Sequence, residues 1–110
     1  MKGVIVMKIN AKDVTIRNFY QLKVGDCITN ARYLATDNYK MHDYIVSKYG
    51  HKVPCSIVIA ESRDANKCRS LQVWIAGDWR IWTSPIKSVK KFDDELLVTT
   101  SHSIYRFGLC

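Results

Sequence analysis

Aromatic and basic residues alternate in one stretch of the chain, and there the residue types point to ligand binding. Trp74, Trp79 and Trp82 lie on both sides of a predicted two-residue turn at 77–78, whose glycine suits a type II′ hairpin. Arg80 lies between two of these tryptophans. Indole faces stack on nucleobases, and arginine or lysine side chains neutralise phosphates. The pattern therefore favours a surface that binds an anionic partner.

Strand alternation predicts which of these side chains share a surface. In a strand from Trp79 to Thr83, successive side chains point to opposite faces. Arg80 and Trp82 then share one face, and Trp79 shares the other with Ile81. Because Ile81 is expected in the core, we assign Trp79 to the core as well. The residues predicted to bind the partner are Arg32, Arg80, Trp82, Lys87, Lys90, Lys91 and Arg106.

Two other interpretations of these residues stay open. Three tryptophans in a small β protein can be core residues or the anchors of an oligomer interface. The three lysines after Pro85 can equally protect the exposed edge of a sheet. The protein would then be an oligomeric structural or interaction protein with an incidental positive charge.

A second candidate surface lies on the predicted helix that precedes the β-rich region. It carries Tyr39, Lys40 and His42, with Arg32 and Tyr33 on the preceding strand. This surface has fewer aromatic and basic residues than the first. We expect His42 to be an ordinary surface histidine.

The cysteine and histidine residues do not form a recognisable metal or catalytic motif. His51, Cys55 and Cys68 lack the closely spaced ligand pairs of structural zinc sites. A cysteine nucleophile needs a neighbouring base, and nothing in the sequence marks Cys55 as activated. The carboxylates at 93–95 fall in a predicted turn. We expect a non-enzymatic protein without a cofactor; a small enzyme that uses Cys55 or His102 is the third hypothesis.

The charge balance indicates the class of partner. The chain has 17 Lys and Arg residues against 10 Asp and Glu residues, which gives a net charge of +7. Such a surface attracts nucleic acid, nucleotides or the acidic face of another protein. A hydrophobic fraction of 47% over 110 residues suits a single packed domain, from residue 1 to residue 110.

The sequence favours a cytoplasmic protein without a membrane partner. No apolar run approaches the roughly 20 residues that span a bilayer. The short apolar run near the N-terminus ends at Lys8 without a cleavage site. Cysteines are then reduced. We expect Cys27 and Cys55 in the core and Cys110 exposed.

The hydrophobic pattern predicts an α+β fold. A helix is expected at about 37–49, capped by Thr36 or Asp37 and ended by Gly50. The region from about 54 to 107 is expected to be β-rich, with turns every few residues. Strands are expected at 4–9, 27–35, 54–60, 69–76, 79–83, 86–91, 96–100 and 103–107, whereas 13–22 fits either a short helix or a strand. The expected architecture is an antiparallel meander of five to six strands, as a curled sheet or small barrel, with one covering helix.

Three C-terminal segments resemble the C-terminal hairpin of small proteins encoded by tailed bacteriophages. They are Trp82–Val89, Leu97–Thr100 and Ser103–Phe107, against a family pattern of T-S-x-V/I, a turn, V-x-T and N-S-x-Y. Here Ser101-His102-Ser103 stands where Asn-Ser is commoner. The resemblance implies an accessory phage protein in the host cytoplasm. It would antagonise a host or defence system by engaging a nucleic acid, a nucleotide signal or a host protein.

Overall fold

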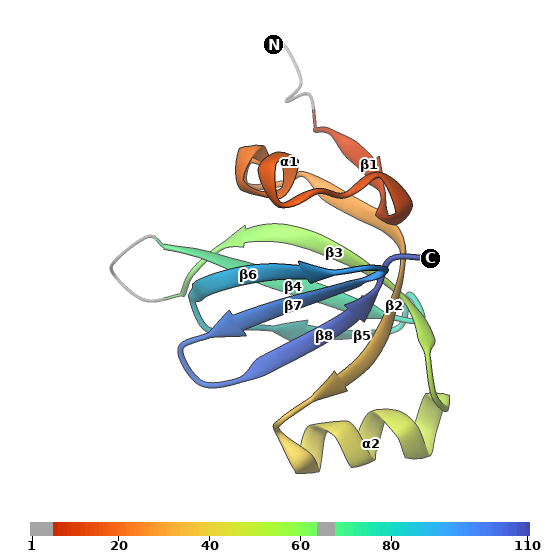
Figure 1. Ribbon diagram of the computed structural model, residues 1–110. Coiled ribbons are helices and arrows are strands. Elements are labelled where there is room, and N and C mark those ends of the chain that lie inside the picture. Colours follow the sequence, from red (N-terminus) through yellow and green to blue (C-terminus); the bar gives the residue numbers. More distant parts are fainter. Residues whose placement is uncertain (1–5, 64–67) are drawn as a thin grey trace, which may run out of the picture.

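The chain forms one mixed sheet with two α-helices outside it (Figure 1). The computed structural model describes residues 6–63 and 68–110. In chain order the elements are β1 (Lys8–Asn10), a 3-10 turn (Ala11–Asp13), α1 (Ile16–Gln21), β2 (Cys27–Thr36), α2 (Tyr39–Tyr49), β3 (Val53–Glu61), β4 (Arg69–Ile75), β5 (Trp79–Trp82), β6 (Ile86–Phe92), β7 (Glu95–Thr100) and β8 (Ile104–Gly108).

The strands form two meanders that join in the middle of the sheet. The order is β5-β4-β3-β2-β8-β7-β6; all these pairs are antiparallel, and β1 adds to β2 in parallel. The α+β class with an antiparallel sheet is thus confirmed. The expected architecture of a five- to six-stranded meander with one helix was wrong, because the described chain joins eight strands in one sheet and has two α-helices. Alternation along the chain does not reveal that β2 pairs with both β3 and β8.

The sheet is rolled, and its two edge strands are linked directly. With strands about 4.8 Å apart, seven flat strands would place β5 and β6 roughly 29 Å apart. The link at 83–85 can span at most about 14 Å between Trp82 and Ile86. The sheet must therefore curl until its edges approach one another, although within residues 6–63 and 68–110 β5 and β6 each form hydrogen bonds with one strand only.

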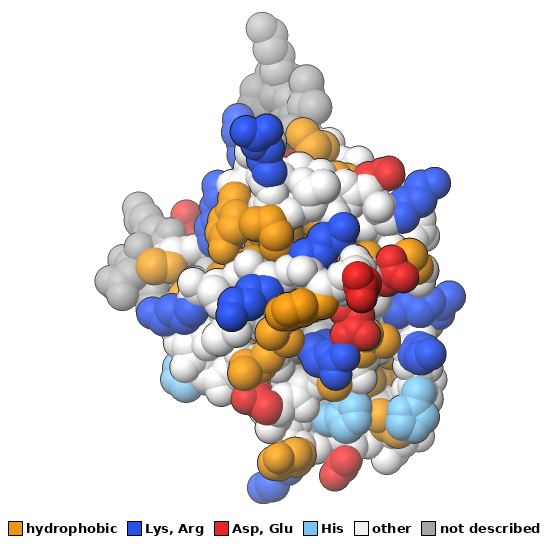
Figure 2. Space-filling model, viewed as in Figure 1, with side chains coloured by type: hydrophobic (Ala, Val, Ile, Leu, Met, Phe, Trp, Pro, Cys, Tyr) orange, Lys and Arg blue, Asp and Glu red, His pale blue; other side chains and the backbone are white. Residues whose placement is uncertain are grey.

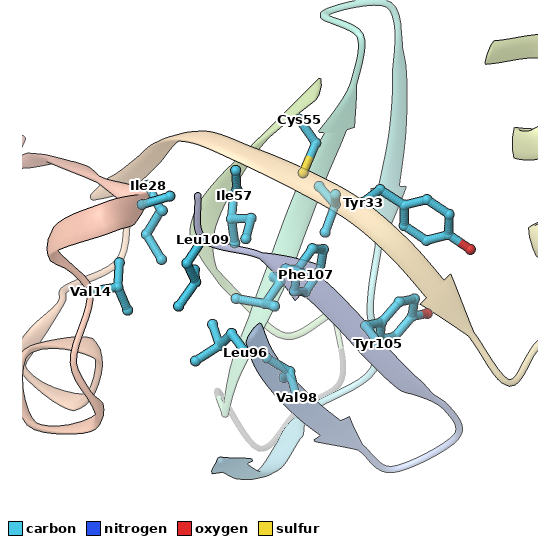
Figure 3. Packing of buried hydrophobic residues seen from close by; sticks show 14 of the residues in the cluster. Val14, Ile28, Tyr33, Cys55, Ile57, Leu96, Val98, Tyr105, Phe107 and Leu109 are labelled. Carbon is cyan, nitrogen blue, oxygen red and sulfur yellow. The ribbon is translucent and has the colours of Figure 1, made fainter. Parts of the chain in front are cut away.

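The two faces of the sheet differ in composition. The outward face of β6, β7 and β8, which lies in front in Figure 1, mixes basic, acidic and apolar side chains (Figure 2). The inward face is apolar, and side chains from β2, β3, β7 and β8 point into the same interior (Figure 3). One row of paired positions crosses four strands and is buried throughout: Ile28, Ile57, Val73 and Ile81. Full burial of each such side chain contributes about 1.5–3 kcal/mol.

The N-terminal segment forms a helix where its sequence pattern was ambiguous. Thr15 caps α1: its side chain accepts a hydrogen bond from the Asn18 N–H at 3.1 Å, and the Asn18 side chain accepts one from the Thr15 N–H at 2.8 Å. This capping box favours a helix, and Phe19 packs into the core from it. The first strand begins at Lys8 instead of residue 4; residues 4 and 5 lie outside the described range.

Helix α2 begins later than expected and lies across one end of the rolled sheet. Asn38 is its cap and accepts a hydrogen bond from the Met41 N–H at 3.2 Å. Thr36 is still part of β2, and the Asp37 carboxylate accepts from the Ile104 N–H, which explains why neither is the cap. In Figure 1 α2 lies at the opposite end from α1 and β1, so it closes an end of the roll and does not cover a face.

The β4–β5 turn differs from the expected type II′ turn. The positive φ angles are at Ala76 (53°) and Gly77 (69°), and the Ile75 carbonyl accepts from the Asp78 N–H at 2.9 Å. Two successive positive φ angles are typical of a type I′ turn. Ile75 then pairs with Trp79, and this register determines which outward side chains meet.

Candidate nucleic-acid interface

The outward face of β4 and β5 brings together two tryptophans and two arginines. Trp74 lies directly opposite Arg80, and Trp82 follows two positions later on β5. Arg63 reaches the same face from the loop after β3. Arg80 and Trp82 share this face and Ile81 is buried on the other, as strand alternation predicted. These four residues are called the tryptophan–arginine surface below.

Guanidinium and indole groups alternate along this surface. The Arg63 guanidinium carbon is 4.2 Å from the ring centroid of Trp82. The Arg80 guanidinium carbon is 5.6 Å from the Trp82 ring and 5.4 Å from the Trp74 ring. Each distance is within the range of an attractive cation–π contact. The order across the surface is therefore Arg63, Trp82, Arg80, Trp74.

The Trp82 ring is held in a fixed position. Its Nε1 donates a hydrogen bond to the Ser70 Oγ at 3.1 Å. Ser70 is fully buried although it lies on the outward face of β4, and its partner Ala60 on β3 is also buried. The Trp82 indole accounts for this burial because it contacts Ser70 from above. Trp82 thus forms a rigid platform on the sheet.

The two arginines carry charges that no described carboxylate balances. Within residues 6–63 and 68–110 the ion pairs are Lys48–Asp78 and the Arg106–Glu95 pair. A guanidinium presents five N–H donors in a planar fork and accepts no hydrogen bond. Arg63 and Arg80 therefore present donors to an external anion.

The other five predicted residues lie on other strands, and none of the described contacts joins them to this surface. Lys87, Lys90 and Lys91 lie on β6, Arg106 on β8 and Arg32 on β2. Lys90 pairs with Leu97, which pairs with Arg106, so these residues lie on the second meander. The expectation that the lysines occupy a sheet edge is confirmed, because β6 is an edge strand.

Two of these basic side chains already have partners within the chain. Arg106 forms an ion pair with Glu95, and the Arg32 Nη1 donates to the Lys52 carbonyl at 3.0 Å. Acidic side chains also lie among the basic ones on the face that Figure 2 shows. Arg32 and Arg106 would therefore have to give up these partners to bind an external anion.

One member of the site was missed from the sequence. Arg63 belongs to a polar loop without periodicity, and nothing local indicates that its side chain reaches Trp82 on β5. Trp74 was recognised in the aromatic pattern but was not among the predicted binding residues. The β4–β5 register, which places it opposite Arg80, was the missing information.

The cysteines and histidines have structural surroundings. Burial raises the pKa of the Cys55 thiol to about 12, which keeps it protonated at neutral pH. Cys27 is only half-buried, contrary to the expected core position, whereas Cys110 is exposed as expected. His42 is not an ordinary surface residue, because its Nδ1 lies 2.7 Å from the hydroxyl of the buried Tyr33. Among the described residues, no three His, Cys, Asp or Glu side chains form a metal-binding group.

Comparisons with protein-family models, with curated proteins and with solved structures found no match. The resemblance to small phage proteins therefore stays a prediction. Within the described part of the chain, no helix has the length and apolar character needed to cross a membrane.

Proposed function

We propose that the protein is a non-enzymatic binding module that holds single-stranded nucleic acid on the tryptophan–arginine surface. The observation that carries the proposal is the alternation of Arg63, Trp82, Arg80 and Trp74 at cation–π distances. Single-strand-binding proteins combine the same two elements, which are positive groups for the backbone and flat faces for the bases.

The geometry favours a single strand over a duplex. Bases in a duplex stack on one another and present only their edges to a protein, whereas unpaired bases stack on aromatic rings and on guanidinium planes. Arg80 lies between two indoles, so its outer edge is available to phosphate while its plane is fixed. Arg63 comes from a loop, so a base can take its place on Trp82.

The charge of the protein supports the same partner. A net charge of +7 favours association with a polyanion at low salt. Each phosphate contact to a single strand adds about 0.7 to the slope of log affinity against log salt. The affinity should therefore fall steeply as the salt concentration rises, whatever the base sequence of the strand.

The test compares two charge-matched variants. Affinity for a labelled oligothymidylate of about 16 nucleotides is measured by fluorescence anisotropy for wild type, Arg80→Gln and Arg32→Gln. Loss of a charged hydrogen bond and a stacked guanidinium should make Arg80→Gln at least about tenfold weaker. Arg32→Gln removes the same charge from β2, two strands away from β4, and should change affinity about twofold or less. Equal losses in both variants would mean that overall charge, not this surface, determines binding.

Competition experiments decide between anionic partners. Unlabelled single strand should displace the labelled oligomer, whereas duplex of the same length and a mononucleotide should compete poorly. A mononucleotide that competes as well as the oligomer would instead indicate a nucleotide-binding protein.

The oligomer hypothesis predicts a different result for the central tryptophan. Trp82→Ala should abolish nucleic-acid binding and leave the sedimentation coefficient unchanged. A wild-type oligomer that dissociates in this variant would indicate that the surface is a subunit interface.

A further inference from the structure

An open groove lies beside α2, on the other side of β5 from the tryptophan–arginine surface. Its volume is about 530 Å³, and its lining residues are Asn38, Lys40, Met41, Tyr44 and Trp79. The rings of Tyr44 and Trp79 are 5.0 Å apart with an interplanar angle of 54°. The groove therefore has an aromatic wall formed by a helix and a strand together.

The groove and the tryptophan–arginine surface meet at the start of β5. Trp79 and Arg80 are consecutive on β5, and their side chains point to opposite faces. Trp79 is the first residue of the strand and lies against Tyr44 of α2. A flexible chain bound along the outward face can thus pass round this end of β5 into the groove.

One basic side chain on the groove can meet a phosphate. Lys40 is exposed on its rim, and none of the described carboxylates is within ion-pair distance of its ammonium group. Asp78 is already bound: it accepts a hydrogen bond from the Tyr49 hydroxyl at 2.8 Å and lies 3.7 Å from the Lys48 Nζ. The negative charge of Asp78, in the β4–β5 turn, is thus balanced by Lys48.

We infer that a nucleic-acid strand bound to the tryptophan–arginine surface continues round the Trp79 end of β5 into this groove. One base stacks against Tyr44 and Trp79, and its phosphate contacts Lys40. This inference rests on the proposed function and extends it to a second subsite. It makes affinity depend on strand length, because short oligomers reach only the first surface.

A length series tests the second subsite. Oligothymidylates from about 3 to about 16 nucleotides are titrated against wild type, Lys40→Gln/Tyr44→Leu and the control Lys12→Gln/Tyr20→Leu. The control removes the same charge and the same type of ring from exposed positions outside the groove. The groove variant should bind the longest oligomer about tenfold more weakly and the shortest one as wild type does. The control should match wild type at every length.

The outcomes separate this inference from the proposed function. If Arg80→Gln leaves binding unchanged at all lengths, the proposed function fails. If Arg80→Gln weakens binding but the groove variant follows the wild-type length dependence, only the second subsite is wrong. A groove variant that loses affinity equally at all lengths also contradicts it.

A crosslinking measurement on the unmodified chain covers the case in which the variant does not fold. Oligomers with one 5-bromouracil at successive positions are irradiated with the protein and the crosslinked peptides are identified. One terminal position should crosslink to Tyr44, in the tryptic peptide 41–48. Crosslinks confined to residues 63–82, with none to that peptide at any position, would overturn the inference.

Discussion

Replacement of Trp82 by alanine should lower the stability of the free protein, apart from any effect on binding. The variant loses two cation–π contacts, to Arg63 and Arg80, at about 0.5–1 kcal/mol each. It also loses the hydrogen bond to Ser70, at about 1 kcal/mol. The free energy of unfolding should therefore fall by about 2–3 kcal/mol. Trp74→Ala loses one cation–π contact, to Arg80, and should cost only about 0.5–1 kcal/mol.

Urea unfolding with linear extrapolation measures both variants. The unfolding midpoint should move well below wild type in Trp82→Ala and little in Trp74→Ala, with the denaturant slope unchanged. Trp82→Phe keeps a ring face but not the Nε1–H, so it should lie between the two. Equal effects for Trp82→Ala and Trp74→Ala would refute the argument that Ser70 and two arginines hold the Trp82 ring.

Four further predictions concern charge, pH, backbone strain and thiol reactivity. Arg80→Gln should reduce the slope of log affinity against log salt by about 0.7 for single-stranded DNA; an unchanged slope would mean that this arginine contacts no phosphate. Two backbone N–H groups at 2.8 Å lower the pKa of Asp26 below 3.8, so the carboxylate stabilises the fold above its unfolded pKa and the gain is lost as pH falls through the folded pKa. Asp26→Asn should therefore unfold at lower urea than wild type at pH 7, and the difference should shrink below about pH 4, as a pH series of urea midpoints would show. Ala76→Gly should raise the free energy of unfolding by up to about 1 kcal/mol, because φ is 53° at this residue; lower stability would contradict the turn geometry. In the folded protein at pH 7.5 a thiol reagent should label exposed Cys68 and leave Cys55 unmodified until urea is added, and mass spectrometry of the labelled peptides would check this.

The sequence was informative where local periodicity decides the structure. On β5, strand alternation correctly placed Arg80 on the outward face and Ile81 in the core. On β4, it likewise separated Trp74 from the buried Val73. The α+β class and most strand positions came from the same kind of evidence. Asn38, not Thr36 or Asp37, caps α2. Thr36 is still part of β2, and the Asp37 carboxylate already accepts a hydrogen bond from the Ile104 N–H.

The features that the sequence did not reveal depend on contacts between distant segments. Lys90 and Arg80 are near one another in sequence, yet they lie on β6 and β5, which do not form a hydrogen-bonded pair in the described chain. Arg63 reaches Trp82 only because β3, β4 and β5 are adjacent. Neither relation has a local signal in the chain. The tryptophan–arginine surface could therefore be predicted in residue type and at Arg80 and Trp82, but not at Arg63 and Trp74.

The pairing of β2 with β8 has a consequence for how the chain acquires its structure. Tyr33 and Phe107 are direct partners although they are about seventy positions apart in sequence. Closing so long a loop costs chain entropy before the contact stabilises anything, so the protein should fold in milliseconds to seconds, as high-contact-order β proteins do. During synthesis the first meander would emerge from the ribosome with one edge of β2 unpaired from Arg32 to Thr36 until β8 follows, whereas β1 already pairs with Cys27–Thr29. In that interval the nascent chain is exposed to edge-to-edge association, a hazard that ends when β8 pairs with β2.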